Sequence, residues 1–184
     1  FNPLVIKITL EGGSIMDYRM EHKEHQKFLA LVRAFPNEIS GDDNDHSISD
    51  FWTECYEKNL IGPMQALRPE GKRDLYGLCS PLKDSETHFN YGIGIVLNED
   101  TDQKELERFI KNGYSIWITE PVNYAVFKCF GPDGNCLGET WTKFFNEFVP
   151  QTGYMQTDDT DYEIYFDNGE SGLFCELWIP VKKN

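Results

Sequence analysis

The last two strands predicted from the sequence carry the residues that are best suited to chemistry. Residues 162–166 and 174–181 show the alternation, with a polar loop between them, that is typical of a β-hairpin. If that loop is centred symmetrically, Glu163 lies directly opposite Glu176 on the neighbouring strand. Alternation then predicts one shared face made of Glu163, Tyr165, Phe174, Glu176 and Trp178. A register shift of one residue would turn one of the two strands over.

Two facing carboxylates in aromatic surroundings favour two kinds of chemistry. Like charges about 5 Å apart repel each other, and the cost grows where aromatic neighbours exclude water. The pair therefore either shares a proton, which raises its apparent pKa and suits a general base, or binds a cation. At an effective dielectric constant of about 20, a ligand ammonium contributes on the order of 4 kcal/mol before desolvation. Each flanking aromatic face adds ~0.5 to 2 kcal/mol. A solvated strand face is the alternative for any single glutamate in so acidic a chain.

An internal repeat organises the chain. The predicted order strand, strand, helix, strand, strand occurs twice, and residues 50–57 (DFWTECYE) resemble residues 139–146 (ETWTKFFN). We expect a single domain over residues 15–184, preceded by an arm or linker over residues 1–14. The two halves of this domain are expected at about residues 15–98 and 114–184.

The repeat predicts the wall that faces the C-terminal hairpin. Tyr76 and Leu78 are expected to line this wall, and Gly92, which has no side chain, is expected to leave room for a ligand. Trp52 and Trp141 lie on the apolar faces of two predicted helices, where a core position is the favoured interpretation.

The predicted elements define the fold class. Strands are expected at residues 4–10, 18–24, 28–35, 75–81, 89–97, 114–119, 124–130, 162–166 and 174–181. Helices are expected at residues 47–59, 102–112 and 137–149, and the last of these is expected to stop at Pro150. So few helices cannot cover both faces of the sheet. We therefore predict an α+β fold of duplicated ββαββ modules with pseudo-twofold symmetry, in which antiparallel sheets carry helices on one side and a ligand groove on the other.

Charge and composition exclude several classes of partner. The 184 residues include 31 acidic and 17 basic side chains, so a net charge of −14 repels phosphate backbones and anionic lipids. No apolar run approaches the ~18 residues of a membrane span, and no signal peptide opens the chain, so we expect a cytoplasmic protein without a membrane partner. The chain opens with Phe1 rather than Met, which suggests a piece of something longer.

The sequence offers no cofactor or metal motif. It contains no P-loop, no G-x-G-x-x-G and no G-x-S-x-G. His22 and His25 are three residues apart on a predicted strand, so their rings point to opposite faces and do not form a metal site. We expect neither a metal nor a cofactor, and a monomer for the isolated domain.

Several short motifs give the chain a family resemblance. They are residues 16–19 (MDYR), 124–127 (YAVF), 148–150 (FVP), 162–165 (YEIY) and 175–182 (CELWIPVK). In this order they resemble the GyrI-like, or effector-binding, domains found at the C-terminus of many AraC-type bacterial transcription regulators and also as free-standing proteins.

The resemblance implies a ligand groove between two strand-and-helix modules. It also implies that Glu163 and Glu176 match two acidic positions that meet cationic, aromatic ligands in drug-sensing relatives, with Tyr165 and Trp178 as neighbouring wall positions. In a regulator, DNA would be contacted only through a domain that is absent from this chain.

Three functions follow as hypotheses. The first is a binding module for a small cationic or aromatic molecule. The second is a small-molecule hydrolase in which Glu163 or Glu176 acts as general base, as the resemblance to free-standing relatives implies. The third is an acidic inhibitor that occupies the basic site of a protein partner.

Overall fold

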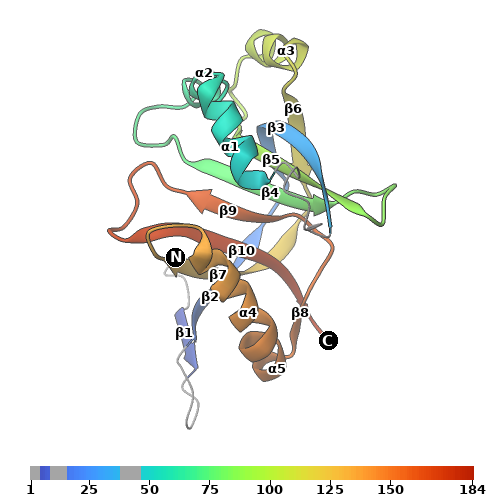
Figure 1. Ribbon diagram of the computed structural model, residues 1–184, viewed down its shortest axis with the longest axis vertical. Helices are drawn as coiled ribbons and strands as arrows, with labels where there is room; N and C mark the ends of the chain where they lie inside the picture. Colours follow the sequence, from blue (N-terminus) through green and yellow to red (C-terminus); the bar gives the residue numbers. More distant parts are fainter. Residues whose placement is uncertain (1–4, 9–15, 38–46) are drawn as a thin grey trace.

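The computed structural model describes residues 5–8, 16–37 and 47–184 (Figure 1). The strands are β1 (Val5–Ile8), β2 (Met16–Lys23), β3 (Gln26–Pro36), β4 (Leu75–Pro81), β5 (His88–Val96), β6 (Ser115–Thr119), β7 (Val122–Phe130), β8 (Tyr154–Gln156), β9 (Asp161–Tyr165) and β10 (Leu173–Lys183). The helices are α1 (Ile48–Glu57), α2 (Ile61–Gln65), α3 (Gln103–Lys111), α4 (Asn135–Lys143), the π-helical turn η1 (Phe144–Phe148) and α5 (Val149–Thr152). The sequence missed α2 and β8. Most of the arm predicted over residues 1–14 lies outside the described residues.

The strands form one ten-stranded antiparallel sheet with the order β1-β2-β7-β10-β9-β4-β5-β3-β6, and β8 pairs with β10. The eight strands from β2 to β6 form two matching sets of four. Counted inward from the two ends, β2 corresponds to β6, β7 to β3, β10 to β5 and β9 to β4. The pseudo-twofold axis therefore passes between β4 and β9, which pair directly. The first strand of each half pairs with a strand of the other half: β2 pairs with β7, and β6 pairs with β3. The predicted α+β duplication is confirmed.

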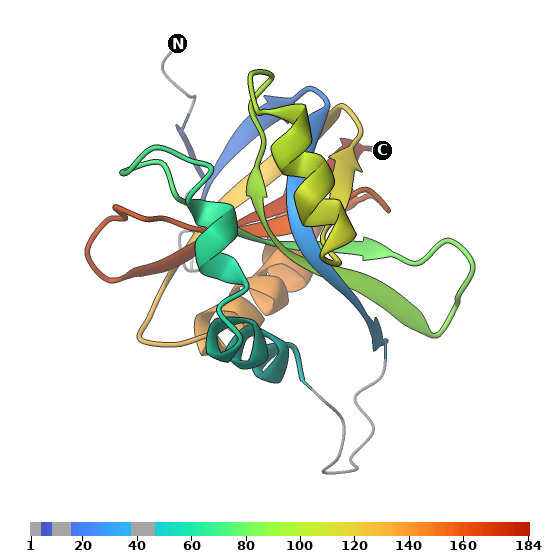
Figure 2. The ribbon, with the colours of Figure 1, turned by 90° about the horizontal axis from the view of Figure 1, so that it is seen from above.

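The helices pack on one face of the sheet in two groups. A capping box starts α1, since the Ser47 side chain accepts a hydrogen bond from the backbone N–H of Asp50 and the Asp50 carboxylate accepts one from that of Ser47. The first-half core holds Phe51 of α1 and Phe109 of α3, with side chains of β3 and β5. The second-half core holds Phe144 of η1 with side chains of β7 and β10. Figure 1 shows α1 to α3 above the central strands and α4 and α5 below them, and Figure 2 shows α3 lying across β3.

A third core fills the opposite face of the sheet. It holds Phe28, Ala30, Leu78, Tyr124, Val126, Tyr162, Ile164 and Trp178, which come from strands of both halves. The rings of Tyr162 and Trp178 stack with centroids 5.5 Å apart. The ligand groove was predicted on this face. This part of the prediction is wrong, because the strands curve around an aromatic core that occupies the expected space.

The C-terminal hairpin has a register that differs by one residue from the predicted one. Leu177, not Glu176, lies opposite Glu163. In its pairing with β7, β10 has a β-bulge between Leu173 and Cys175, so Phe174 is an extra residue in this strand. Because side chains alternate between faces, Glu163 and Glu176 point to opposite sides of the sheet, and the predicted shared face is wrong. On β10, Cys175 and Leu177 face the helices as predicted, so β9 is the strand that is turned over.

The helix predicted to stop at Pro150 continues to Thr152. The turn η1 precedes this proline, and its wider π-helical spacing accommodates a residue that has no N–H to donate to the regular helical ladder. Gly153, with a φ of 72°, then ends the run in the left-handed conformation that favours glycine. In the described part of the chain, none of the helices combines the length and apolar character needed to cross a membrane.

Candidate functional site

A cavity of about 540 Å³ opens on the helix side of the sheet, where the two halves meet. Trp52 and Tyr56 of α1 line it from the first half, with Tyr91 of β5. Tyr165 of β9 and Phe174 of β10 line it from the second half. Trp52 meets Tyr165 edge to face across the boundary, with ring centroids 5.3 Å apart. The cavity is therefore aromatic on both sides.

Glu163 is the one charged residue among the described residues that line this cavity. Its Oε2 atom accepts hydrogen bonds from the hydroxyl groups of Tyr91, at 2.9 Å, and Tyr165, at 3.0 Å. The Tyr91 oxygen accepts a hydrogen bond in turn from Nε1 of Trp52, at 3.0 Å. Within the described residues, no side chain donates to Oε1 of Glu163, and no Lys, Arg or His forms an ion pair with it. The carboxylate is therefore oriented by two tyrosines and has no cationic partner in the part of the chain that the structure describes.

The surroundings of Glu163 disfavour its negative charge. Burial raises the pKa of Glu163 above its ordinary value, and the hydrogen bonds from Tyr91 and Tyr165 act in the opposite direction. Burial and the nearby Glu163 carboxylate also raise the pKa of Tyr91 well above its usual range, so this phenol stays a neutral donor. A cation placed in the cavity would stabilise the ionised form of Glu163, because none of the described lining residues carries a positive charge.

Gly77 makes room for this hydrogen-bond network. It lies on β4 directly opposite Glu163, and a Cβ atom at this position would overlap both the Tyr91 hydroxyl and the Glu163 carboxylate. A glycine inside a strand often marks such a close approach.

We expect Gly77→Ala to lower the free energy of unfolding by about 1 to 3 kcal/mol, because the added methyl group must push both side chains away. Urea unfolding followed by tryptophan fluorescence measures this effect. Gly138→Ala is the matched control. Gly138 is exposed within α4 and its added Cβ would meet nothing, so the same substitution should there raise stability by ~0.5 to 1 kcal/mol. Equal stability of the two variants would contradict this account of Gly77.

The eight residues predicted for the ligand site fall on two different faces. Glu163, Tyr165 and Phe174 line the cavity. Glu176 and Trp178 lie on the opposite face, where Glu176 is 5% exposed. Both oxygens of Glu176 accept hydrogen bonds from Arg19, each at 2.7 Å, and Oε2 also accepts one from Nε1 of Trp178 at 3.1 Å. Glu176 therefore already has a cationic partner within the protein.

The wall predicted from the repeat also lies on the opposite face. Tyr76 and Leu78 pack in the third core, against residues such as Phe28 and Tyr162. Gly92 faces the ring of Trp117, 3.2 Å from the position of an added Cβ, and not a ligand space. These three residues therefore do not line the cavity beside Glu163, although the repeat predicted that they would face the C-terminal hairpin across one groove.

Sequence reasoning missed three residues of the site. Trp52 was assigned to the core, yet it is only half-buried and lines the cavity. Tyr91 stands in an apolar run with nothing in the sequence to distinguish it from a core residue. Gly77 gave a usable signal, because a glycine in the middle of a predicted strand indicates a close approach.

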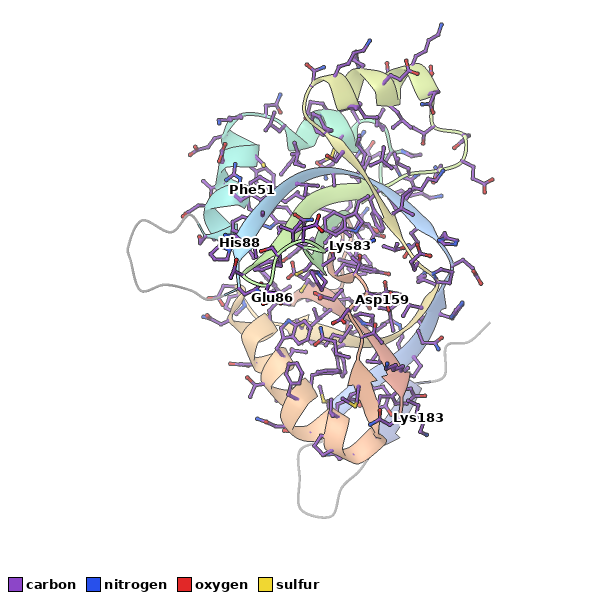
Figure 3. The ribbon with its side chains drawn as sticks, turned by 90° about the vertical axis from the view of Figure 1, so that its right-hand side faces the viewer. Phe51, Lys83, Glu86, His88, Asp159 and Lys183 are labelled. Carbon is purple, nitrogen blue, oxygen red and sulfur yellow. The ribbon has the colours of Figure 1, made fainter. Side chains whose placement is uncertain are left out.

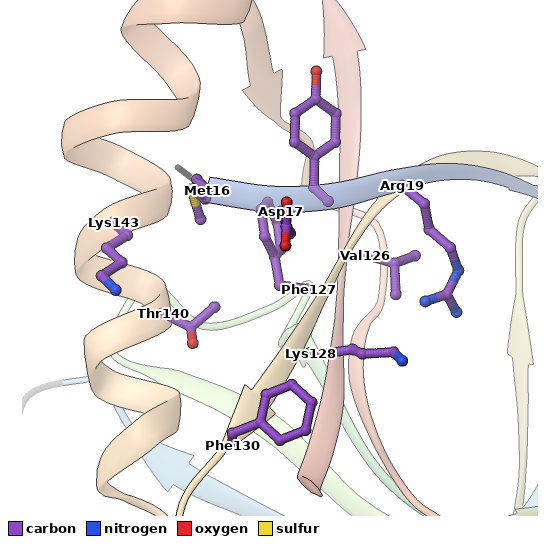
Figure 4. A pocket seen from close by; sticks show the side chains of 10 residues that line it. Met16, Asp17, Arg19, Val126, Phe127, Lys128, Phe130, Thr140 and Lys143 are labelled. Atoms are coloured by element: carbon purple, nitrogen blue, oxygen red, sulfur yellow. The ribbon is translucent and has the colours of Figure 1, made fainter. Parts of the chain in front are cut away.

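A separate pocket of about 390 Å³ lies between β2, β7 and α4 (Figure 4). Lys128 and Lys143 are among its lining residues, so it is less suited to a cation than the cavity beside Glu163. Among the described residues, no group of three or more His, Cys, Asp or Glu side chains is arranged to hold a metal ion.

The fold is that of a GyrI-like effector-binding domain, and its two strand-and-helix modules flank the cavity beside Glu163. Residues 19–181 match the Cass2 family of integron-associated effector binding proteins, and the chain belongs to this family. The resemblance inferred from the sequence motifs is confirmed.

The chain is also similar to individual known proteins. The DNA gyrase inhibitor of Erwinia billingiae (strain Eb661) is 25% identical over 138 residues, which cover 68% of this chain and 88% of the relative. The structure of SAV2435 bound to tetraphenylphosphonium has a TM-score of 0.70 and 18% identity, covering 91% of this chain and 94% of that chain. A putative transcription regulation protein from Staphylococcus aureus MU50 has a TM-score of 0.65 and 19% identity, covering 91% and 99%. At these identities the two structures show a shared fold.

Proposed function

We propose that this chain binds lipophilic cations in the cavity beside Glu163 and acts as the effector-binding part of a regulator or as a free-standing relative. The observation that carries this proposal is the Glu163 carboxylate, which is held by two tyrosines, surrounded by aromatic rings and unpaired with any described cation. Such a group attracts positive charge, and each aromatic face adds ~0.5 to 2 kcal/mol through cation–π contact.

The size of the cavity supports a ligand of several rings. A volume of about 540 Å³ falls within the range of small-molecule sites. SAV2435, which shares the fold, has been solved with tetraphenylphosphonium, a cation surrounded by four aromatic rings. The net charge of −14 adds a long-range attraction for cations and repels nucleic acid, so control of a promoter would need a separate DNA-binding domain.

A pair of ions with the same shape and opposite charge tests the proposal. Tetraphenylphosphonium and tetraphenylborate differ mainly in the sign of their charge, so apolar contacts favour both about equally. We expect the cation to bind at least ~30-fold more tightly, which corresponds to ~2 kcal/mol. Quenching of tryptophan fluorescence or titration calorimetry measures both affinities.

Measurements at high salt distinguish binding beside Glu163 from attraction by the net charge of the protein. At about 0.5 M salt, the attraction between the bound ion and surface charges more than a few ångströms from it is screened. The attraction between the ion and a partly buried carboxylate is screened much less. The preference for the cation should therefore persist. Equal affinities for the two ions at high salt would reject the proposal.

A further inference from the structure

The strand β6 forms one end of the sheet. It pairs with β3 on one side, and no described strand pairs with it on the other side. Figure 3 shows the pale yellow β6 descending from α3 beside the blue β3. The opposite end of the sheet is formed by β1. A strand at the end of a sheet can pair with a further strand through the backbone groups of its outer side.

The backbone groups on the outer side of β6 belong to Ile116 and Ile118. The N–H of Gln26 on β3 points toward β6, because it donates to the Thr119 hydroxyl at 3.2 Å. Gln26 lies opposite Thr119, and in an antiparallel pair every second residue bonds across the ladder, so Thr119 and Trp117 bond to β3. The N–H and C=O groups of Ile116 and Ile118 therefore face away from the sheet, and no described backbone group bonds to them.

The side chains along this edge are apolar and exposed. Ile116 and Ile118 are 37% and 55% exposed, and Ile110 of the adjacent helix α3 is 47% exposed. The sequence of β6 (SIWIT) contains no charged residue, although the chain carries a net charge of −14. Sheets commonly protect an edge with a lysine, a proline or a β-bulge, and β6 has none of these. The edge is therefore open to pairing with another strand.

We propose that two copies of this chain associate by antiparallel pairing of their β6 strands, with a twofold axis at Trp117. In this register, Ile116 of each copy lies opposite Ile118 of the other. These residues carry the outward-facing N–H and C=O groups, so all of those groups form hydrogen bonds between the copies. The two Trp117 residues lie opposite each other as a pair without hydrogen bonds, where cross-strand side chains are closest.

The composition of β6 makes this register self-complementary. Ser115 lies opposite Thr119, and the isoleucines of both copies gather on the helix side of the joined sheet. No charged residue of one β6 strand faces a charged residue of the other, so the two acidic copies meet where β6 itself adds no repulsion. A second copy of the chain therefore fits this edge.

The expected dimer is weak, because the interface is small. A pair of five-residue strands with their isoleucines buries on the order of 600 to 800 Å² in total, which is below the ~1,200 Å² of a stable interface. The net charge of −14 on each copy adds a repulsion that salt screens. We expect a dissociation constant of roughly 10 to 100 µM at about 0.5 M salt.

Sedimentation equilibrium over about 10 to 500 µM protein, at about 0.15 and 0.5 M salt, tests this inference. We expect the average mass to rise from 21.3 kDa toward twice that value. The rise should begin at a lower protein concentration in the higher salt, because salt screens the repulsion and leaves the backbone pairing and apolar contacts. A mass that stays at the monomer value up to about 500 µM in both salts would reject the dimer. The sequence-based expectation of a monomer would then hold.

Ile118→Pro tests whether the copies meet through β6. Proline has no N–H, and the N–H lost at this position faces outward, so the ladder between β6 and β3 remains. Each copy loses one of its two donors, and we expect the dissociation constant to rise at least ~30-fold. Ile118→Val is the matched control, because it keeps the N–H and a β-branched side chain. Its dissociation constant should change by less than ~5-fold.

Hydrogen exchange provides a second test on the unaltered protein. The Trp117 N–H bonds to β3 and should exchange slowly at every protein concentration. The N–H groups of Ile116 and Ile118 should exchange faster in the monomer. Raising the concentration from about 20 to 500 µM at 0.5 M salt should slow their exchange at least ~2-fold. Unchanged exchange at these two residues would reject pairing through β6.

Other modes of association give different results. If β6 instead paired with β1 of the next copy, free edges would remain at both ends, and the mass would continue to increase beyond that of a dimer. A dimer that is equally tight in Ile118→Pro and Ile118→Val would form through another surface. Either result would reject the proposed twofold pairing. Cation binding beside Glu163 is a separate question, because no described residue that lines that cavity belongs to β6.

Discussion

Glu163→Gln is expected to weaken tetraphenylphosphonium binding by about 30-fold or more and to remove most of the preference over tetraphenylborate. Glutamine keeps the shape of the side chain and can still accept hydrogen bonds from Tyr91 and Tyr165 through its oxygen. The substitution therefore removes charge and leaves the cavity intact. Calorimetry with the two ions on wild-type and variant protein measures the change.

The fold should tolerate Glu163→Gln well. Because the folded state raises the pKa of Glu163, ionisation at neutral pH costs stability, and this cost grows as pH rises from the ordinary pKa toward the raised one. A neutral amide avoids the cost, so thermal stability at neutral pH should be equal or higher. Glu57→Gln, at an exposed position on α1, is the control for the loss of one charge. Equal losses of affinity in both variants would show that Glu163 has no special role.

Glu176→Gln is expected to have the opposite effects from Glu163→Gln: a large loss of stability and little change in affinity for tetraphenylphosphonium. The substitution removes the partner that Arg19 contacts through two nitrogens, in a site where Glu176 is only 5% exposed, and leaves the half-buried Glu21 as the remaining carboxylate paired with Arg19 among the described residues. Breaking a buried pair in this way costs about 3 kcal/mol, which lowers the melting temperature by roughly 6 to 12 °C for a chain of this size. Thermal and urea unfolding measure the effect.

A double replacement tests whether the pair, and not the glutamate alone, matters. Removing both charges with Arg19→Met and Glu176→Leu should recover much of the lost stability, because apolar groups of similar volume can replace a buried ion pair. Wild-type stability in Glu176→Gln, together with lost tetraphenylphosphonium binding, would show instead that Glu176 contacts the ligand. That result would support the sequence-based hypothesis that Glu163 and Glu176 bind the ligand together.

Local sequence signals were sufficient to predict the elements that build the site. The capping box at Ser47 and Asp50 marks the start of α1 because it satisfies backbone groups within one turn. The matching Trp52 and Trp141 indicate the duplication because both halves use the same helix position. Both tryptophans are half-buried against the core of their own half, as predicted, and Trp52 also lines the cavity.

The sequence placed part of the Glu163 surroundings correctly. The argument assigned Glu163, Tyr165 and Phe174 to a single face, and they do share a cavity, although not with Glu176. The reason is that the bulge at Phe174 changes the alternation by one residue. A bulge depends on how β10 fits against β7, and hairpin residues alone do not reveal it.

Periodicity, capping and charge are properties of short segments, so they were enough to predict the fold class, the duplication, the acidic surface and the strand that carries Glu163. Which glutamate has a cationic partner depends instead on contacts between segments that are distant in the sequence. Arg19 neutralises Glu176 from 157 positions away, whereas the hydrogen bonds that the Glu163 carboxylate accepts from described side chains come from Tyr91 and Tyr165. Such partners are brought together by strand order and register, which result from the packing of the whole sheet and not from any single segment.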